Sequence, residues 1–412
     1  MEDPIPLTSP EFTAGDDAAP RVTPRTSPWV PVLGVLVVLL LAGFVFLEPA
    51  VKSLGPQPRR RLLVEDDLAL VAQQRSLEAF TAAWFFMLGA SLGSFLHCVE
   101  YRVPRRISIV ARGSACPGCA TPIRMWHNVP VLGWLWLRGR CAACGWAIPS
   151  RYAFTEFAFG LVFVLLMTAE LAGAGINLPF WSSNPSLGMV ENVWTLKWNL
   201  LGVYIYHSAL ITLLLTYCLF ALDRFRLPTM LVGLGILLGI VWPLVWPAFQ
   251  VVSWNGGPAL PMAEFARLHV AATLAVGALA GLVLGGSMVR RTPGNMRAGD
   301  AASTILSNLM VGLYLGWQAA VSIATISLAL RLLFLLSPAR RWPVVVSIAL
   351  ATLFHLLGWR WLQQLEYWPG SSRHWALSLA ALLAIAIAAL LLDGIEHGGD
   401  AGPPQLDPPP DK

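Results

Sequence analysis

The chain has 412 residues, of which 56% are hydrophobic and only 12% are charged. Ordinary soluble domains carry about 25% charged residues. The composition therefore excludes a cytosolic enzyme, a secreted disulfide scaffold and a nucleic-acid-binding protein. The formal net charge of +5 is explained by arginines that flank membrane spans on the cytoplasmic side. We expect an integral membrane protein whose main surroundings are the lipid bilayer.

Apolar runs long enough to cross a bilayer, about 20 residues each, recur along the chain. In chain order the predicted spans are 29–46, 80–98, 153–171, 200–222, 230–249, 268–289, 302–335, 344–362 and 377–392. The run at 302–335 is long enough for a hairpin of two spans, with its turn at Leu315, Gly316 and Trp317. Basic residues on both sides of it favour an even number of crossings. The predicted fold is an all-α polytopic membrane protein with about ten spans.

Changes in composition divide the chain into segments. Residues 1–28 and 394–412 are polar, acidic and rich in proline, which predicts disorder. Residues 29–47 form an extra N-terminal span, which lacks the cleavage site of a signal peptide, and 341–393 hold additional C-terminal spans. Between them lie an N-terminal domain at 80–156, with a polar loop at 100–151, and a membrane domain at 200–336. Eight arginines indicate that the loop is cytoplasmic.

Four of the six cysteines form two CxxC pairs in this loop, Cys116 with Cys119 and Cys141 with Cys144. Four thiolates satisfy tetrahedral zinc and leave no open position, which is typical of a structural site. A disulfide or a redox-active pair is the alternative, but disulfides rarely persist in the cytoplasm. The spacing therefore predicts a small cytoplasmic zinc-knuckle domain, since bound metal would stabilise a loop too small for its own core.

The segments around the cysteines resemble those of a known family. They read Gly93-Ser-Phe-Leu-His-Cys-Val-Glu-Tyr-Arg-Val-Pro104, then Leu137-Arg-Gly-Arg-Cys141, and then Ile148-Pro-Ser-Arg-Tyr-Ala-Phe-Thr-Glu156. Their order and spacing resemble the N-terminal domain of type IV prepilin peptidases, which are leader peptidases and N-methyltransferases. The resemblance implies that 80–156 is a prepilin-peptidase-like domain and that 200–336 is an aspartic peptidase membrane domain.

Two aspartates match the catalytic positions of that family more loosely. Asp223 precedes Pro228 by five positions, where the family usually has seven. Asp300 ends a GxGD-like motif in which Arg297 replaces the first glycine. Carboxylates at a membrane boundary are also functional-site hypotheses by themselves. The alternative is that each aspartate caps a helix or pairs with a neighbouring arginine, Arg224 or Arg297.

The resemblance implies an aspartic endopeptidase of the bacterial inner membrane, acting in type IV pilus or type II secretion systems. It would cleave the basic leaders of prepilin or pseudopilin substrates at the cytoplasmic face. Two close carboxylates share a proton, so that one can activate water while the other polarises the peptide carbonyl. N-methylation of the new N-terminus with S-adenosylmethionine rests on the resemblance alone. The alternative function is a non-catalytic membrane assembly protein that retains the zinc domain.

Overall fold

The structure is a computed structural model. It describes residues 66–109, 113–181, 189–195, 197–255, 266–289, 298–335 and 342–369, together with residues 380 and 384. The predicted span at 29–46, most of that at 377–392, and the terminal segments 1–28 and 394–412 lie outside these residues.

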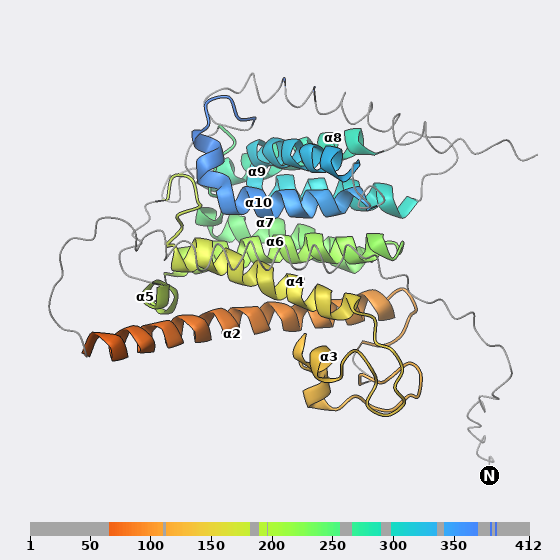
Figure 1. The fold of residues 1–412 in the computed structure, drawn as a ribbon. Helices are drawn as coiled ribbons and strands as arrows, with labels where there is room; N and C mark the ends of the chain where they lie inside the picture. Colours follow the sequence, from red (N-terminus) through yellow and green to blue (C-terminus); the bar gives the residue numbers. More distant parts are fainter. Residues whose placement is uncertain are drawn as a thin grey trace, which may run out of the picture. The chain divides into compact units, whose positions relative to one another are not determined.

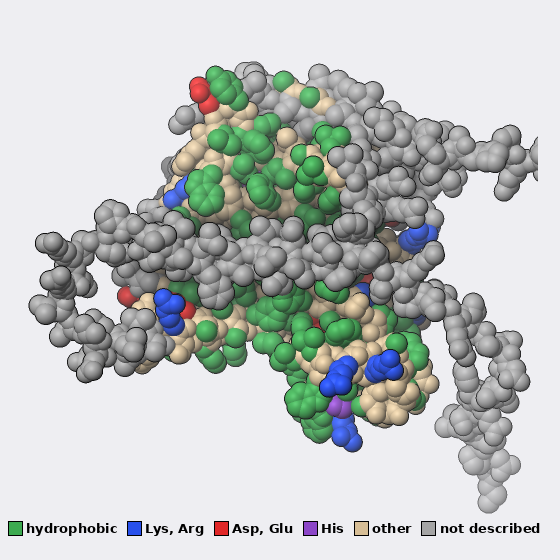
Figure 2. Space-filling view, in the orientation of Figure 1, with side chains coloured by type: hydrophobic (Ala, Val, Ile, Leu, Met, Phe, Trp, Pro, Cys, Tyr) green, Lys and Arg blue, Asp and Glu red, His purple; other side chains and the backbone are tan. Residues whose placement is uncertain are grey.

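Six helices in the described ranges are long and apolar enough to cross a membrane. They are α2 (Asp66–Arg102), α4 (Arg151–Leu166) with its π-helical continuation η2 (Met167–Ala172), α6 (Trp198–Leu222), α8 (Ala266–Met288), α9 (Ala298–Leu335) and α10 (Val344–Gln364). Figure 1 shows most of them lying side by side, and Figure 2 shows hydrophobic side chains over much of the described surface of one face. The all-helical membrane class is supported, because the described residues contain no β-strand. The count of about ten spans is not confirmed.

Two helices differ from their predicted spans. α2 has 37 residues and extends beyond both ends of the predicted span at 80–98. α7 (Thr229–Val245) has only 17 residues and is shorter than the predicted span at 230–249. A short stretch with Trp246 and the 3₁₀ turn η4 (Pro247–Phe249) follows α7, because Pro247 has no amide hydrogen with which to continue the helix.

The first arm of α9 packs closely on α8 through glycines that face each other. A Cβ added to Gly277 of α8 would lie 2.1 Å from the backbone oxygen of Gly312, and one added to Gly281 would lie 2.3 Å from that of Asn308. Small residues allow such close contact between helices in a membrane. At Gly316 the backbone leaves the helical region, with φ 83° and ψ 171°, a conformation that glycine adopts without a Cβ penalty.

The chain reverses direction at this break. Tyr314, before the break, stacks on Tyr206 of α6 with 4.5 Å between ring centroids. Ser322, after the break, hydrogen-bonds His355 of α10 at 2.9 Å. One turn further along α10, the centroid of the Trp359 ring lies 6.0 Å from that of His207, which follows Tyr206 on α6. Eight residues of continuous helix would separate the two positions by about 12 Å. The two arms of α9 therefore run in opposite directions, and the turn predicted at residues 315–317 is present.

Polar contacts join α10 to the loop that follows η2. Arg360 donates hydrogen bonds to the backbone oxygens of Leu178 and Trp181, and Asn177 donates to the backbone oxygen of Leu356. Nearby, Glu170 of η2 and His207 of α6 form a buried pair with 2.7 Å between Oε1 and Nδ1. These contacts fix the part of the chain that follows α9 onto the helices that precede it.

Candidate active site and metal site

The loop between α2 and α4 contains two similar knuckles. Each begins at a cysteine and closes with an isolated antiparallel bridge. The turn residue with positive φ is Ala120 in the first knuckle and Gly145 in the second. Backbone amides of Gly118 and Ala143 point at the sulfurs of Cys116 and Cys141, each at 3.4 Å. Amide-to-sulfur hydrogen bonds of this kind stabilise thiolates. The two CxxC pairs are thus folded locally, by their own turns.

The four sulfurs of the two knuckles converge on one point. The Sγ atoms of Cys116, Cys119, Cys141 and Cys144 all lie within 4.8 Å of one another. Cys116 Sγ and Cys144 Sγ are 3.8 Å apart, which equals the edge of a tetrahedron of sulfurs at about 2.3 Å from a central zinc. A disulfide requires about 2.05 Å, and all four cysteines are unbridged.

Asp223 lies just after the last residue of α6, where it is held by an arginine from another helix. Arg151, the first residue of α4, donates Nη1 to Oδ1 at 2.7 Å and Nη2 to Oδ2 at 2.5 Å. Burial raises the pKa of Asp223, but the hydrogen bonds with Arg151 and Glu100 outweigh it and hold the pKa below its usual value. Arg224 is not the partner that the alternative interpretation named. It has φ 61° and lies in the turn that leaves α6.

Two further ionisable groups of α2 lie beside this pair. Glu100 is 1% exposed, and its Oε2 lies 3.8 Å from Arg151 Nη2 and 3.5 Å from Nδ1 of His97. The guanidinium nitrogen that binds Asp223 thus faces Glu100 as well. The ring of His97 packs against Tyr152 at 4.1 Å between centroids. α2, α4 and α6 therefore contribute one cluster, which consists of His97, Glu100, Arg151 and Asp223 and is called the acidic cluster below.

Asp300 lies at the same end of the bundle as Asp223. Later residues of α7 contact earlier residues of α6 and later residues of α9. α6 therefore runs antiparallel to α7 and to α9. α7 and α9 therefore begin at the end where α6 finishes, which we call the Asp223 end. The contacts that set this register are Gly235 against Leu213 and Met310, and Gly239 against Tyr206 and Tyr314. Asp300 lies in the first turn of α9, while Arg297 lies outside the described residues.

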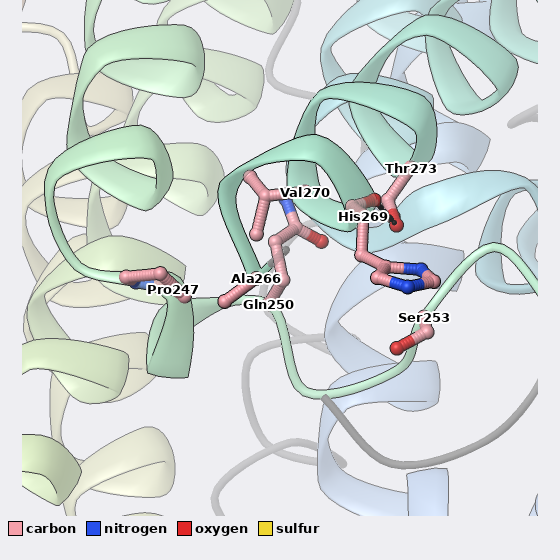
Figure 3. Close-up of a pocket in the computed structure, with 7 residues that line it drawn as sticks. All are labelled: Pro247, Gln250, Ser253, Ala266, His269, Val270 and Thr273. Atoms are coloured by element: carbon pink, nitrogen blue, oxygen red, sulfur yellow. Dashed lines mark hydrogen bonds between the residues drawn. The ribbon is translucent and has the colours of Figure 1, made fainter. Parts of the chain in front are cut away.

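A small pocket elsewhere does not belong to this site. It is lined by residues of the α7–α8 connection and of the start of α8, with His269 and Ser253 pointing toward it (Figure 3). Gln250 at its edge donates to the backbone oxygen of Leu313, close to the turn at Gly316. The pocket is therefore at the end of the bundle opposite to Asp223.

Comparison with known proteins identifies the N-terminal part of the chain. Residues 87–169 match the Bacterial Peptidase A24 N-terminal domain. For these residues, the resemblance to type IV prepilin peptidases is confirmed. The matched segment contains Glu100, the four cysteines and Arg151, whereas Asp223 and Asp300 lie beyond it.

Three similar curated proteins carry the same name, "Prepilin leader peptidase/N-methyltransferase". The protein of Myxococcus xanthus is 45% identical over 82 residues, which are 20% of this chain and 24% of the relative. That of Neisseria gonorrhoeae is 33% identical over 114 residues, covering 22% and 40%, and that of Klebsiella pneumoniae is 38% identical over 89, covering 20% and 39%. The chain thus spans between a quarter and two fifths of the length of these relatives. No solved structure matches it.

The sequence pattern did not single out Glu100. It was interpreted as the first residue of the polar loop, but it is still part of α2 and is buried. One signal was available: a carboxylate three residues after His97 lies on the same face of a helix, at the end of an apolar span where ionisable groups are costly.

Proposed function

We propose that the chain is an aspartic endopeptidase of the bacterial inner membrane, which cleaves the basic leaders of type IV prepilin-like substrates at the cytoplasmic face. Asp223 and Asp300 are its acidic pair. The observation that carries the proposal is the helix register, because it brings the last residues of α6 and the first turn of α9 to the same end of the bundle. The match of residues 87–169 to a peptidase domain supports the reaction class.

The surroundings of Asp223 suit one half of the chemistry. A carboxylate held by a bidentate arginine stays ionised, and an ionised carboxylate can accept a proton from the attacking water. Asp300 then takes the complementary role and donates a proton to the peptide carbonyl. The arginines of the flanking loop and turn indicate that this end faces the cytoplasm, where a leader preceding an apolar helix would be exposed.

The four cysteines support structural zinc in the adjacent loop. Cys116, Cys119, Cys141 and Cys144 would hold the ion, which supplies folding stability and no open position for substrate. Methyl transfer from S-adenosylmethionine is supported by the names of the relatives alone, and we assign no residues to it.

One observation favours a second candidate function. Arg151 binds both oxygens of Asp223, and an aspartate so engaged also fits a purely structural ion pair. In that case the chain is a non-catalytic membrane assembly protein that keeps the zinc domain. Asp223→Asn would then cost only about 1 kcal/mol of stability.

Leader cleavage in membranes distinguishes the two functions. The full-length chain is expressed together with a prepilin that carries a basic leader, and cleavage is followed by gel shift, with membrane abundance as the control for folding. We expect Asp223→Asn and Asp300→Asn each to abolish cleavage, and the double variant to be no worse than either, because both groups act in one step. Glu78→Gln, at a partly exposed carboxylate in the first half of α2, is the matched carboxylate control. Retained cleavage in either Asn variant, or an inactive wild-type chain, would favour the assembly protein.

A further inference from the structure

Glu100 is a buried carboxylate without a donor. Its side chain is 1% exposed, and among the described residues no nitrogen or hydroxyl group donates a hydrogen bond to either oxygen. The nearest nitrogens, on His97 and Arg151, are 3.5 and 3.8 Å away, too far for a good hydrogen bond. An ionised carboxylate left in this state is strongly disfavoured. Its carboxyl group lies beside that of Asp223, because Nη2 of Arg151 is 3.8 Å from Glu100 Oε2 and 2.5 Å from Asp223 Oδ2.

The charged groups around Glu100 also disfavour its ionised form. The groups that face Glu100 are His97 from its own helix, Arg151 and Tyr152 from α4, Asp223 from α6, and Arg105 from the turn after α2. Arg105 is stacked between the Tyr101 and Phe225 rings, at 4.1 and 5.0 Å, and Arg151 is already bound to Asp223. Of these two guanidiniums, only that of Arg151 forms ion pairs with Glu100 and Asp223, and two carboxylates that share a site do not both ionise easily.

We propose that Glu100 is a positioning residue of the acidic cluster. Its carboxyl group holds a proton and donates it in a hydrogen bond to Asp223. This inference rests on the proposed function of Asp223. The proton stays shared between the two carboxyl groups, while Arg151 neutralises the one remaining negative charge. The hydrogen bond from Glu100 and the two from Arg151 fix the orientation of Asp223 from two helices. Loss of the proton places two negative charges side by side and loosens Asp223.

The test is the pH profile of leader cleavage by Glu100→Gln in the full-length chain. A glutamine amide donates a hydrogen bond to Asp223 as the protonated carboxyl does, but it cannot lose its proton. We therefore expect the wild-type rate to fall at alkaline pH, and the Gln variant to keep its rate there. A buried contact with a merely structural role would change the rate by one factor at all pH values. Glu156→Gln is the matched control, since Glu156 is a half-buried carboxylate of α4 that accepts from the Val131 amide at 2.6 Å.

Three results would overturn the role of Glu100. One is a profile of Glu100→Gln that is parallel to wild type, and the second is an alkaline limb that also disappears in Glu156→Gln. The third is a folded Glu100→Gln that does not cleave at any pH, because Glu100 would then supply a proton to the substrate itself. Glu100→Asp, which keeps the carboxyl group but shortens its reach, is expected to retain an alkaline limb with a lower kcat and an unchanged KM.

A readout independent of cleavage separates this inference from the proposed function. Thermal unfolding in detergent is measured over pH for wild type, Glu100→Gln, Asp223→Asn and the double variant. We expect wild type to lose stability relative to Glu100→Gln as the pH rises, and this difference to disappear when Asp223 is already asparagine. If no prepilin is cleaved but this coupling is present, the peptidase proposal fails and the shared proton stands. A pH-independent difference would refute the shared proton whatever the activity.

Discussion

Arg151→Met tests whether the two hydrogen bonds from Arg151 to Asp223 matter more for function than for folding. Methionine keeps the length and most of the apolar contacts of the side chain, but it removes both hydrogen bonds to Asp223. The side chains of Arg151 and Asp223 are 49% and 23% exposed. Solvent screening at that exposure limits a pair with good bidentate geometry to about 1 kcal/mol. We therefore expect the variant to fold and insert normally, with a small decrease in unfolding temperature.

The effect on pH dependence follows from the direction of the pKa shift. In wild type the hydrogen bonds with Arg151 and Glu100 outweigh burial and hold the pKa of Asp223 below its value in the unfolded chain. The resulting stability is fully present above that unfolded value, about 3.9, and is lost as the pH falls through the folded value. Without Arg151 the pKa of Asp223 rises. The acid limb of leader cleavage should then move to higher pH.

The rate at neutral pH should fall by about 10²-fold, the usual consequence of a catalytic group displaced by about 1 Å. The assay is the cleavage of a prepilin by membranes that contain equal amounts of each variant, measured across pH. Arg124→Gln, an exposed arginine of the loop, is the control for loss of one positive charge. A folded Arg151→Met with the wild-type rate and an unmoved acid limb would refute the reasoning.

The remaining predictions concern the metal site and the membrane helices. Purified protein should carry about one zinc per chain, and Cys116→Ser should lower the metal content measured by elemental analysis; protein with intact, reduced thiols and no zinc would contradict this. Gly277→Leu should reduce the amount of folded protein sharply, because its Cβ would lie 2.1 Å from the Gly312 oxygen, whereas Gly286→Leu, with open space around it, should not. Glu170→Leu should destabilise the chain by about 1–3 kcal/mol, since it leaves the buried His207 without its partner; an unchanged thermal unfolding temperature would disprove a role for this pair.

The sequence itself determined the features that depend on short stretches of chain. The two CxxC pairs predict converging thiols because each knuckle closes by its own turn, and the structure brings the four sulfurs together. The helical spans follow from runs of apolar residues, since a backbone surrounded by lipid must satisfy its hydrogen bonds within one segment. The turn at Gly316 was also readable, because the run around it is too long for one span and contains a residue that tolerates φ 83°.

Only the tertiary structure decided which charged groups meet. Arg151 and Asp223 are 72 residues apart in sequence, and each has a nearer group of opposite charge along the chain, so no local pattern pairs them. Glu100 joins them because the close packing of α2 on α4 brings the end of one helix beside the start of the other. Its burial and its missing donors are properties of three packed helices. Charge and spacing along one chain specify where ionisable groups occur, whereas helix packing specifies which of them must share a proton.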